Sequence, residues 1–504
     1  MRTPWLLRSR VRALVAGALA ALALVAVPVV PSEAAPAAAS SAASSAAPSA
    51  GLTSGASSPT AACDALSPIA VPCVALGKTF DAVSAECRRV GVPDLLCVLP
   101  LSHQVTQAAR DAYLQSWVHR TAQFQYALGD TLPLRDAQWI GTHNSFNSLT
   151  DSFSLSHADS NQQLSLTQQL DIDVRSLELD LHYIPQILGL LGPRAVTVCH
   201  GQGPEAMDLG CTTEPVFSQV LPQIATWLNA PGHGDEVILL YLEDNLKNAA
   251  AYASAVATLD SVLRRPNGTS LVYKPDPAQR AANGCTPLPT GLSRDDVRAS
   301  GARVVLVGSC ASGWAGRVFD WSPSHVEGGS AAAYQAYPTC DASYGVGVYA
   351  SQVVRYFEDS TLVSTLLNLQ RPPADPEALT PEKVAAMTAC GVNLYGFDQL
   401  LPEDGRIQST LWSWAPDEPR AGARSCTRQG ADGRWYAAPC TDLRPAACRS
   451  GSTWTVTPAV AFADATAACA AIGSTFDLPR AGDQNSSLHT VAGAAGAWVN
   501  HPIT

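Results

Sequence analysis

The sequence predicts an α/β fold: a (β/α)8 barrel of the TIM type, preceded by a helical segment and followed by a small disulfide-rich module. From about residue 133 to about residue 402, short apolar runs typical of strands alternate with periodic runs typical of helices. These roughly 270 residues match the roughly 250 residues that such a barrel needs. A doubly wound sheet is the alternative fold. No glycine-rich phosphate loop follows an early strand, which counts mildly against that alternative.

The expected elements follow from hydrophobic periodicity. We expect strands at residues 137–141, 174–181, 195–199, 237–242, 271–273, 303–307, 345–349 and 393–397. We expect helices at residues 167–170, 216–228, 249–263, 361–369 and 381–390, and a further helix that begins at residues 293–296. Before the barrel, the apolar spacing of residues 109–128 predicts one packed helix within a Cys-containing segment at residues 61–132.

The amino-terminal residues are typical of a secretory signal peptide. Several arginines precede an apolar run at residues 13–30, and small residues follow around Ser32-Glu33-Ala34. An uncleaved membrane anchor is the alternative, because the run is nearly long enough to span a bilayer. Pro28 and Pro31 favour cleavage, so we expect residues 1–34 to be removed and the protein to be extracellular. Residues 35–60, which are rich in Ala, Ser and Pro, are expected to form a flexible linker.

The composition limits the class of partner. The chain has 504 residues, enough for two or three domains, and its 47% of hydrophobic residues permits large cores. The formal net charge is −11 and no basic tract stands out, so nucleic acid is not an expected partner. An acidic protein can act on a membrane, but electrostatic attraction alone would not hold it on an anionic surface.

The 14 cysteines are an even number in a chain with an export signal, so disulfides are the expected state. No Cys-x-x-Cys pair suggests a zinc site. Close spacing suggests the pairs Cys199–Cys211, Cys285–Cys310 and Cys340–Cys390, and pairing among Cys63, Cys73, Cys87 and Cys97. Sequence alone does not fix this connectivity.

Two carboxylates alternate with leucines on the strand expected at residues 174–181. Because side chains alternate across a strand, Glu178 and Asp180 project from the same face. Adjacent carboxylates repel unless a cation lies between them, and calcium prefers several oxygen ligands. Asn144 offers an amide oxygen and Glu243 a third carboxylate. The alternative is a solvated polar strand face, against which the apolar flanks of the strand argue.

Two histidines follow expected strands. His143 comes after residues 137–141, and His200 comes after residues 195–199. In a barrel, both would lie at the carboxyl-terminal face, where catalytic groups gather. Either histidine alone is more often structural, but the two together predict acid–base chemistry near neutral pH.

These segments together resemble the X region of phosphatidylinositol-specific phospholipase C. That family has a His-Asn pair after its first strand, Glu-x-Asp on its second, His-Gly after the next, and a glutamate that ends an apolar strand. The chain shows, in the same order, Thr142-His143-Asn144-Ser145, Glu178-Leu179-Asp180, Cys199-His200-Gly201 and Tyr241-Leu242-Glu243. Each motif is weak alone, but the ordered set is fairly specific and covers roughly half of the chain.

The resemblance implies a metal. Calcium-independent bacterial members of this family carry an arginine where the chain has Asp180, and that guanidinium stands in for the ion. With an acid at this position, the chain resembles the calcium-dependent type. By this resemblance, Asn144, Glu178, Asp180 and Glu243 are the expected calcium ligands.

The resemblance also implies two-step cleavage of a phosphodiester, in which a substrate hydroxyl attacks the neighbouring phosphorus. The family uses the 2-hydroxyl of inositol. His200 is expected to protonate the diacylglycerol oxygen that leaves. His143 is expected to contact the phosphoryl group or to act as the base, a role that a metal-bound carboxylate could share. Asp398, at the end of the last expected strand, is a candidate to orient His143, although a strand-end acid can equally be a cap.

The residues that would recognise the headgroup do not follow from the motifs. Lys274 and Arg355 are substrate-binding candidates by rough location only, as are Arg303 and Ser309. Specificity for inositol is therefore open, and other phospholipid headgroups or a glycosyl-inositol anchor are alternatives.

The last hundred or so residues, 406–504, are expected to form a separate module. Their Trp and Cys pattern resembles a C-type lectin-like domain in circularly permuted order: Trp454, Cys469, Gly473 and Trp498 come last, whereas Glu418-Pro419, Cys426, Trp435, Cys440 and Cys448 come first. The resemblance implies the disulfides Cys426–Cys440 and Cys448–Cys469. The usual sugar-binding calcium motif is not evident, and a structural appendage is the alternative.

The leading hypothesis is a secreted, calcium-dependent phosphodiesterase of residues 133–405 that meets a phospholipid surface transiently as a monomer. One alternative is a barrel with decayed chemistry that displays the lectin-like module to a carbohydrate or protein. Another is a glycerophosphodiesterase, against which the lack of a His-Arg-Gly sequence near the first strand argues.

Overall fold

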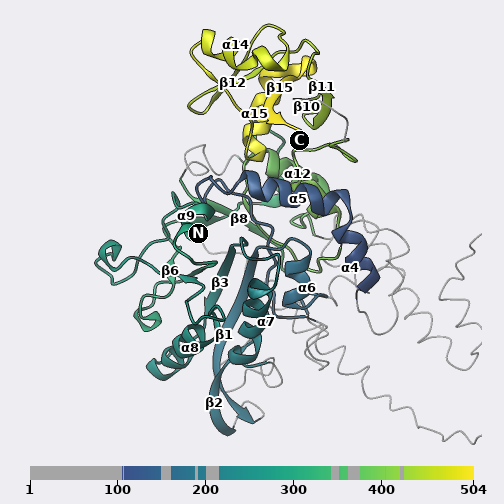
Figure 1. The fold of residues 1–504 in the computed structure, drawn as a ribbon. Coiled ribbons are helices and arrows are strands. Elements are labelled where there is room, and N and C mark those ends of the chain that lie inside the picture. The colour runs from purple at the N-terminus through teal and green to yellow at the C-terminus, as the bar shows by residue number, and fades with distance from the viewer. Residues whose placement is uncertain are drawn as a thin grey trace, which may run out of the picture. The chain divides into compact units, whose positions relative to one another are not determined.

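The computed structural model describes residues 105, 107–148, 160–187, 191–199, 215–341, 351–360, 375–402, 404–420 and 425–503 (Figure 1). The chain divides into two compact units, Met1–Ser57 and Ser58–Thr504, and all described residues belong to the second. The expected signal peptide and linker lie outside the described residues, as do Cys63, Cys73, Cys87, Cys97 and the elements expected at 345–349 and 361–369.

The main sheet is formed by six strands. They are β1 (Ser176–Ile187), β2 (Leu191–Val198), β3 (Ile238–Asp244), β4 (Val272–Tyr273), β5 (Val304–Gly308) and β6 (Phe319–Asp320). β1, β3 and β5 run parallel in that order, and β5 pairs on its other side with β4 and then β6. β5 is buried along its whole length, as expected for a central strand of a parallel sheet.

The curvature of the sheet brings its early and late strands together. β7 (His325–Glu327), β8 (Val353–Phe357) and β9 (Leu394–Gly396) form a second parallel ladder. The segment 139–142 bridges it to the main sheet, because Trp139 pairs with Leu394 and Gly141 pairs with Ser176, both in parallel. The chain therefore has a mixed α/β fold with a curled sheet. Within the described residues no ladder joins β6 to β7, so the expected complete (β/α)8 barrel is not confirmed.

Helices begin at side-chain caps where the sequence provides them. The helices of this part are α4 (Gln107–Leu114), α5 (Trp117–Leu128), α6 (Leu166–Asp171), α7 (Phe217–Asn229), α8 (Ala249–Val262), α9 (Arg294–Ala299), α12 (Pro381–Ala389) and α13 (Gly405–Thr410). Ser165 and Ser293 form capping boxes at α6 and α9. The single helix expected at 109–128 is wrong: Ser116 accepts a hydrogen bond from the His119 amide and starts α5 as a new helix.

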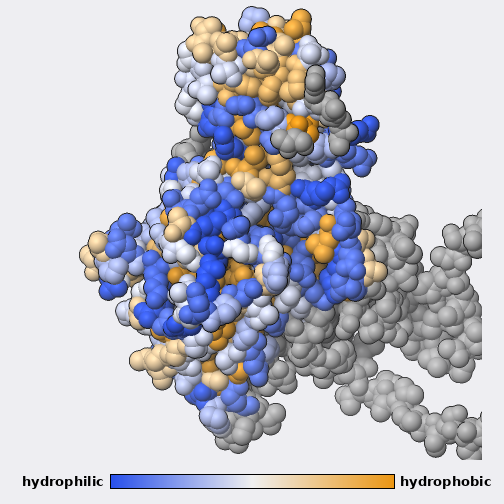
Figure 2. Space-filling model, in the orientation of Figure 1, coloured by the Kyte–Doolittle hydropathy of each residue, from blue (hydrophilic) through white to orange (hydrophobic). Residues whose placement is uncertain are grey.

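The side chains of β1 alternate between the two faces of the sheet, and a hydrophobic core lies on each face. Leu177 and Leu179 pack with residues of α7 and α8, which lie beside the β1–β3 pair (Figure 1). Trp139, Leu239 and Val305 belong to a second cluster on the inner side of the curled sheet. Glu178 and Asp180 alternate with the leucines, so they face the inner side. The visible surface of the described residues is largely hydrophilic (Figure 2).

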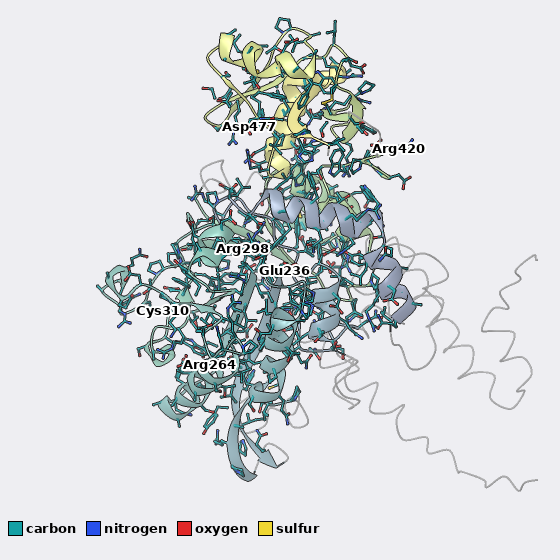
Figure 3. The ribbon with its side chains drawn as sticks, viewed as in Figure 1. Glu236, Arg264, Arg298, Cys310, Arg420 and Asp477 are labelled. Atoms are coloured by element: carbon teal, nitrogen blue, oxygen red, sulfur yellow. A yellow bond between two sulfur atoms is a disulfide. The ribbon has the colours of Figure 1, made fainter. Side chains whose placement is uncertain are left out.

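Ion pairs hold the amino-terminal edge of the sheet. Arg175, which precedes β1, binds Glu236, which precedes β3, with 2.7 Å between Nε and Oε2. Arg298 of α9, which is labelled with Glu236 in Figure 3, binds Asp130 at 2.7 Å. This edge is therefore closed by charged side chains, and the opposite, carboxyl-terminal edge carries the predicted site. Among the described residues, no helix combines the length and the apolarity needed to cross a bilayer.

The carboxyl-terminal part contains two small antiparallel sheets. One is formed by β10 (Ser425–Gln429), β11 (Trp435–Pro439) and β15 (Ala497–Pro502), and the other by β12 (Ala447–Ser450), β13 (Thr453–Val456) and β14 (Thr475–Phe476). Helices α14 (Ala465–Ala471) and α15 (Gly482–Ala492) accompany them. Phe124 of α5 contacts the rings of Trp414 and Trp435, with centroids 5.6 and 6.0 Å away.

Four predicted disulfides are confirmed. They are Cys285–Cys310, Cys340–Cys390, Cys426–Cys440 and Cys448–Cys469. Cys199 is also disulfide-bonded, and its predicted partner Cys211 lies outside the described residues. The last two pairs staple the carboxyl-terminal part, where the apolar clusters are small.

Candidate active site

Three predicted metal ligands lie close together on the neighbouring strands β1 and β3. The parallel register places Asp180 opposite Glu243 and Glu178 opposite Tyr241. Glu178 and Asp180 are buried, whereas Glu243 is exposed. One carboxylate oxygen of each lies within 4.8 Å of the others. The expectation that Glu178 and Asp180 share a face is therefore met, and β3 supplies the third acid.

The three acids form an electrostatically unfavourable group. Burial raises the pKa of Glu178. Burial raises the pKa of Asp180 well above its ordinary value, and the charges of Glu243 and Glu178 raise it further. A bound cation would stabilise carboxylates that are arranged in this way.

Asn144 lies between the acids and His143. It is buried and has a φ of 44°, a left-handed conformation that asparagine tolerates better than most residues. Its amide oxygen and nitrogen can be assigned in two ways: in one, the nitrogen donates to Asp180 Oδ2 at 2.9 Å. In the other, the nitrogen donates to Asn161 Oδ1 at 3.2 Å and the amide oxygen faces the Asp180 carboxylate. The second orientation turns two oxygen ligands toward one point, which suits a shared cation.

His143 is paired with Asp398. The Nδ1 atom of His143 lies 3.3 Å from Oδ1 and 3.4 Å from Oδ2 of Asp398. The Nε2 atom lies 3.3 Å from the Asn144 amide, and Phe357 borders the ring with centroids 5.1 Å apart. Burial lowers the pKa of His143, although the charge of Glu178 opposes this effect. The imidazole is thereby favoured in its neutral form, in which one ring nitrogen accepts a proton.

Asp398 is fully buried and tightly held. The Ser360 amide donates to its Oδ2 at 2.6 Å, and Gln162 Nε2 donates to its Oδ1 at 3.3 Å. Its own amide donates to Glu358 at 2.9 Å, and its carbonyl accepts from Arg406 at 2.9 Å. Burial raises the pKa of Asp398 well above its ordinary value. The carboxyl group therefore has a fixed orientation toward His143.

Arg355 reaches the acids from β8. Its Nη1 donates to Glu327 Oε1 at 3.1 Å, and its Nη2 donates to Glu178 Oε2. The guanidinium carbon lies 4.6 Å from the centre of the Phe357 ring and 5.3 Å from that of Tyr241. The sequence suggested Arg355 by location alone, and the structure places it beside a predicted metal ligand.

Within the described part of the chain, two other headgroup candidates, Lys274 and Arg303, are not in contact with the acids. Lys274 is exposed after β4, and its charge lowers the pKa of Asp260 on α8, after a larger effect of the hydrogen bond from Arg317. Among the described residues, no interaction of Lys274 with the acids is found. Arg303 precedes β5 and donates to the Gly234 carbonyl, so it lies at the amino-terminal edge, and its suggested location was wrong.

The strand that leads to His200 is antiparallel to β1, not parallel as a barrel strand would be. β1 continues beyond Asp180, and β2 runs antiparallel beside it so that Val198 pairs with Leu181. The Cys199 amide then donates to the Asp180 carbonyl at 3.1 Å. The end of β2 therefore lies beside the acids because β2 pairs antiparallel with β1, and not because it is a parallel barrel strand as predicted. His200 itself lies outside the described residues.

Comparison with known proteins identifies the family. A model described as the Rv2075c PI-PLC-like domain matches residues 98–404. Two Mycobacterium tuberculosis proteins are each 70% identical over 447 residues, which are 88% of this chain and 92% of the relative: the uncharacterized protein Rv2075c of strain H37Rv and the uncharacterized protein MT2135 of strain CDC 1551. The chain belongs to the Rv2075c PI-PLC-like family.

Solved structures are similar at low identity. The phosphatidylinositol-specific phospholipase C of Listeria monocytogenes is 16% identical, with 58% of this chain and 97% of that chain covered and a TM-score of 0.35. A calcium-dependent phosphoinositol-specific phospholipase C from a Pseudomonas species is 14% identical, with 53% and 91% covered and a TM-score of 0.28.

The structure adds site residues that the motifs did not reveal. Asn161 and Gln162 are buried beside Asp398, and Glu358 and Arg406 hold its backbone. Asn161 and Gln162 belong to a run of polar residues that is typical of a surface loop. Its burial depends on hydrogen bonds to residues more than 200 positions away, which local sequence does not reveal.

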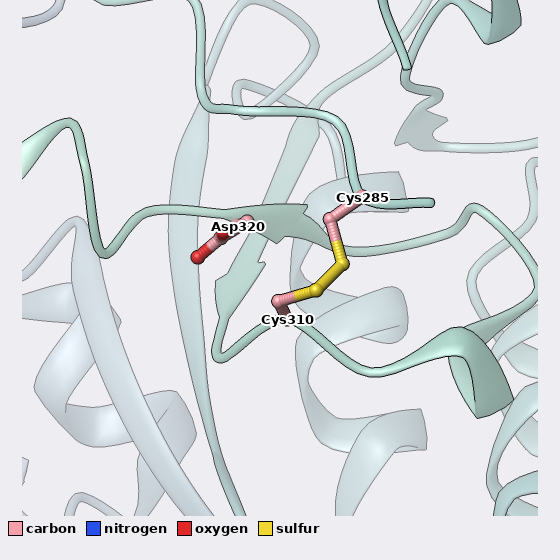
Figure 4. A group of neighbouring side chains, drawn as sticks. All are labelled: Cys285, Cys310 and Asp320. Atoms are coloured by element: carbon pink, nitrogen blue, oxygen red, sulfur yellow. A yellow bond between two sulfur atoms is a disulfide. The ribbon is translucent and has the colours of Figure 1, made fainter. Parts of the chain in front are cut away.

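A second group of possible metal ligands consists of Cys285, Cys310 and Asp320 (Figure 4). The two sulfurs are bonded to each other, so neither is a thiolate. A metal ligand from cysteine is a thiolate, and this group is therefore a structural link between the segment after β4 and the end of β5.

Proposed function

We propose that the chain is a secreted, calcium-dependent phosphodiesterase that cleaves phosphatidylinositol on the glycerol side of its phosphate. The products would be diacylglycerol and a cyclic inositol phosphate. One observation carries this proposal: the His143–Asp398 pair and the acids Glu178, Asp180 and Glu243 converge at one edge of the sheet. Membership of the PI-PLC-like family supports a phosphodiesterase of this kind.

The donor set fits calcium. Glu178, Asp180, Glu243 and Asn144 offer only oxygen ligands, and two of the acids are buried in mutual repulsion. Calcium takes six to eight such ligands, so water and substrate oxygens would complete the sphere. When bound, the ion would offset the charge on the phosphoryl oxygens and lower the pKa of the attacking hydroxyl.

The protein residues would move the protons. His143, neutral because of its burial, would accept the proton of the inositol 2-hydroxyl at Nε2 while Asp398 holds Nδ1. The new oxygen–phosphorus bond would form as the bond from phosphorus to the glycerol oxygen breaks. His200 would give its proton to that leaving oxygen. The hydrogen bond of its neighbour Cys199 to Asp180 supports the assignment of His200 to this site.

The remaining assignments complete the proposal. Residues 133–405 would be the catalytic domain, and Arg355 and Lys274 would contact the substrate. Residues 406–504 would form a permuted C-type lectin-like module with a carbohydrate or protein ligand. The confirmed disulfides support export from the cytoplasm.

Turnover of phosphatidylinositol in vesicles, with calcium or with EGTA, tests the proposal. The wild type should act only with calcium, and His143→Ala should lose about 100- to 10,000-fold in rate. His119→Ala is the matched control. His119 also pairs with an aspartate, Asp173, but it lies on α5 and is not one of the predicted site residues. Absence of turnover under every condition would reject the proposal. Turnover in EGTA would reject only the metal, and a panel of phospholipids would define the headgroup.

A further inference from the structure

Arg355 is a buried cation between two carboxylates. Its guanidinium donates to Glu178 on one side and to Glu327 on the other. The two partners differ in environment, because the side chain of Glu178 is 4% exposed and that of Glu327 is 42% exposed. Each can act as the counter-ion of Arg355, but only Glu178 belongs to the group of three acids.

We infer that Arg355 is an internal cation that competes with calcium for Glu178, and that Glu327 retains the guanidinium when the ion binds. The inference rests on the calcium site of the proposed function and adds a determinant of its affinity. Arg355 is a positioning residue in this role, because it acts on the ion through Glu178.

The charges of the group support this role. Glu178, Asp180 and Glu243 carry three negative charges when ionised, and Arg355 neutralises one of them from the inner side of the sheet. The Glu178 oxygen that accepts from Arg355 has less electron density to offer an ion. The guanidinium and the ion also repel each other across a buried carboxylate, where water screens weakly.

Neighbouring rings limit where the guanidinium can move. Phe357, Tyr241 and Trp321 lie 4.6, 5.3 and 6.0 Å from its central carbon. Glu327 stands opposite Arg355 in the parallel pairing of β7 with β8, so it keeps a partner within reach without a change of backbone. In the proposed role, rotation of the side chain would leave the guanidinium on Glu327 alone, beside His325, whose Nε2 lies 3.1 Å from the same Glu327 oxygen.

A competing cation predicts that its loss improves ion binding. Calcium titration calorimetry of the full chain would compare the wild type with Arg355→Gln, Arg355→Lys, Glu327→Gln and the double variant R355Q/E327Q. Arg355→Gln should bind calcium about tenfold more tightly or better. Arg355→Lys keeps the charge and should stay within about threefold of the wild type. Circular dichroism would confirm that each variant is folded.

The double variant separates competition from simple loss of charge. If Glu327 acts by retaining Arg355, Glu327→Gln weakens calcium binding about threefold or more in the wild type and has little effect in R355Q. An equal effect in both backgrounds would show that Glu327 acts only through its own charge and would overturn its part in the inference.

The outcomes distinguish this inference from the proposed function. Calcium binding that is unchanged or weaker in Arg355→Gln overturns the competition and leaves the calcium site intact. Binding in Arg355→Gln alone supports the competition and shows that Arg355 excludes the ion from the natural chain. Absence of calcium binding in every variant overturns the inference, and turnover of phosphatidylinositol in EGTA then decides the proposed phosphodiesterase separately.

Discussion

Replacement of Asp180 by asparagine should stabilise the chain without calcium and leave it less stable than the wild type with calcium. Burial and the neighbouring acids raise the pKa of Asp180 above its ordinary value of 3.8. The folded chain therefore binds this proton more tightly than the unfolded chain does. As the pH rises from that ordinary value through the raised one, the metal-free chain loses stability, and asparagine removes this loss.

The spacing of the acids sets the magnitude. At 4.8 Å, the upper limit of the distance between the carboxylate oxygens, two unit charges repel by about 3.5 kcal/mol at an effective dielectric constant of about 20. Partial protonation of Asp180 and the charge of Arg355 reduce this repulsion. We therefore expect Asp180→Asn to raise the free energy of unfolding by about 1–2 kcal/mol in EGTA. Calcium at about 100 times its Kd would stabilise the wild type by about 2.7 kcal/mol and the variant far less.

Urea unfolding followed by circular dichroism at neutral pH, in EGTA and in calcium, measures both effects. Asp235→Asn is the matched control: it makes the same change of charge at a side chain that is 96% exposed. The like-charge argument fails if Asp180→Asn is less stable than the wild type in EGTA. If calcium stabilises the variant as much as the wild type, Asp180 is not a ligand.

Two further predictions concern the histidine pair and the segment that carries it. Asp398→Asn should lower kcat about 10- to 100-fold with little change in KM, because it removes the buried carboxyl group that orients Nδ1 of His143; an unchanged kcat would contradict the pairing. The acid limb of the wild-type pH profile should lie below 6.5, since burial lowers the pKa of His143. Gly141→Ala should lower the free energy of unfolding by about 1–3 kcal/mol, because its Cβ would overlap with the Tyr395 carbonyl oxygen. Gly234→Ala, whose Cβ meets no atom within 4 Å, is the control, and equal urea midpoints would refute the steric argument.

The strands that carry the acids could be predicted because their periodicity is strong. The alternation of leucines with Glu178 and Asp180 is visible in the sequence. β3 occupies nearly the expected residues, whereas β1 starts near the expected residue but continues to Ile187. Their register could not be predicted, because neither strand contains information on its offset from the other. The distance between Asp180 and Glu243 is a property of the pair of strands.

The contacts between residues of distant segments escaped prediction, even where one residue, Arg355, was named as a candidate. Arg355 lies inside a five-residue strand, where a buried charge is unexpected unless its partners are known. Those partners, Glu178 and Glu327, are 177 and 28 positions away. The β1–β2 hairpin was missed for another reason: the fold class predicted parallel neighbours, but the chain returns beside the strand that it has just left.

The acidic residues of the predicted site destabilise the folded chain when no ion is bound. Burial raises the pKa of Glu178, Asp180 and Asp398, and each is held among groups that leave it little water. A chain selected for stability alone would place apolar side chains at these inner positions of the sheet. The local rules for strands and cores thus fail together at one edge of the sheet, and failures that cluster in this way are expected at a functional site. The substitution Asp180→Asn tests this reasoning directly. If it raises the free energy of unfolding in EGTA, then a residue that the motif assigns to the metal is also one that destabilises the metal-free chain.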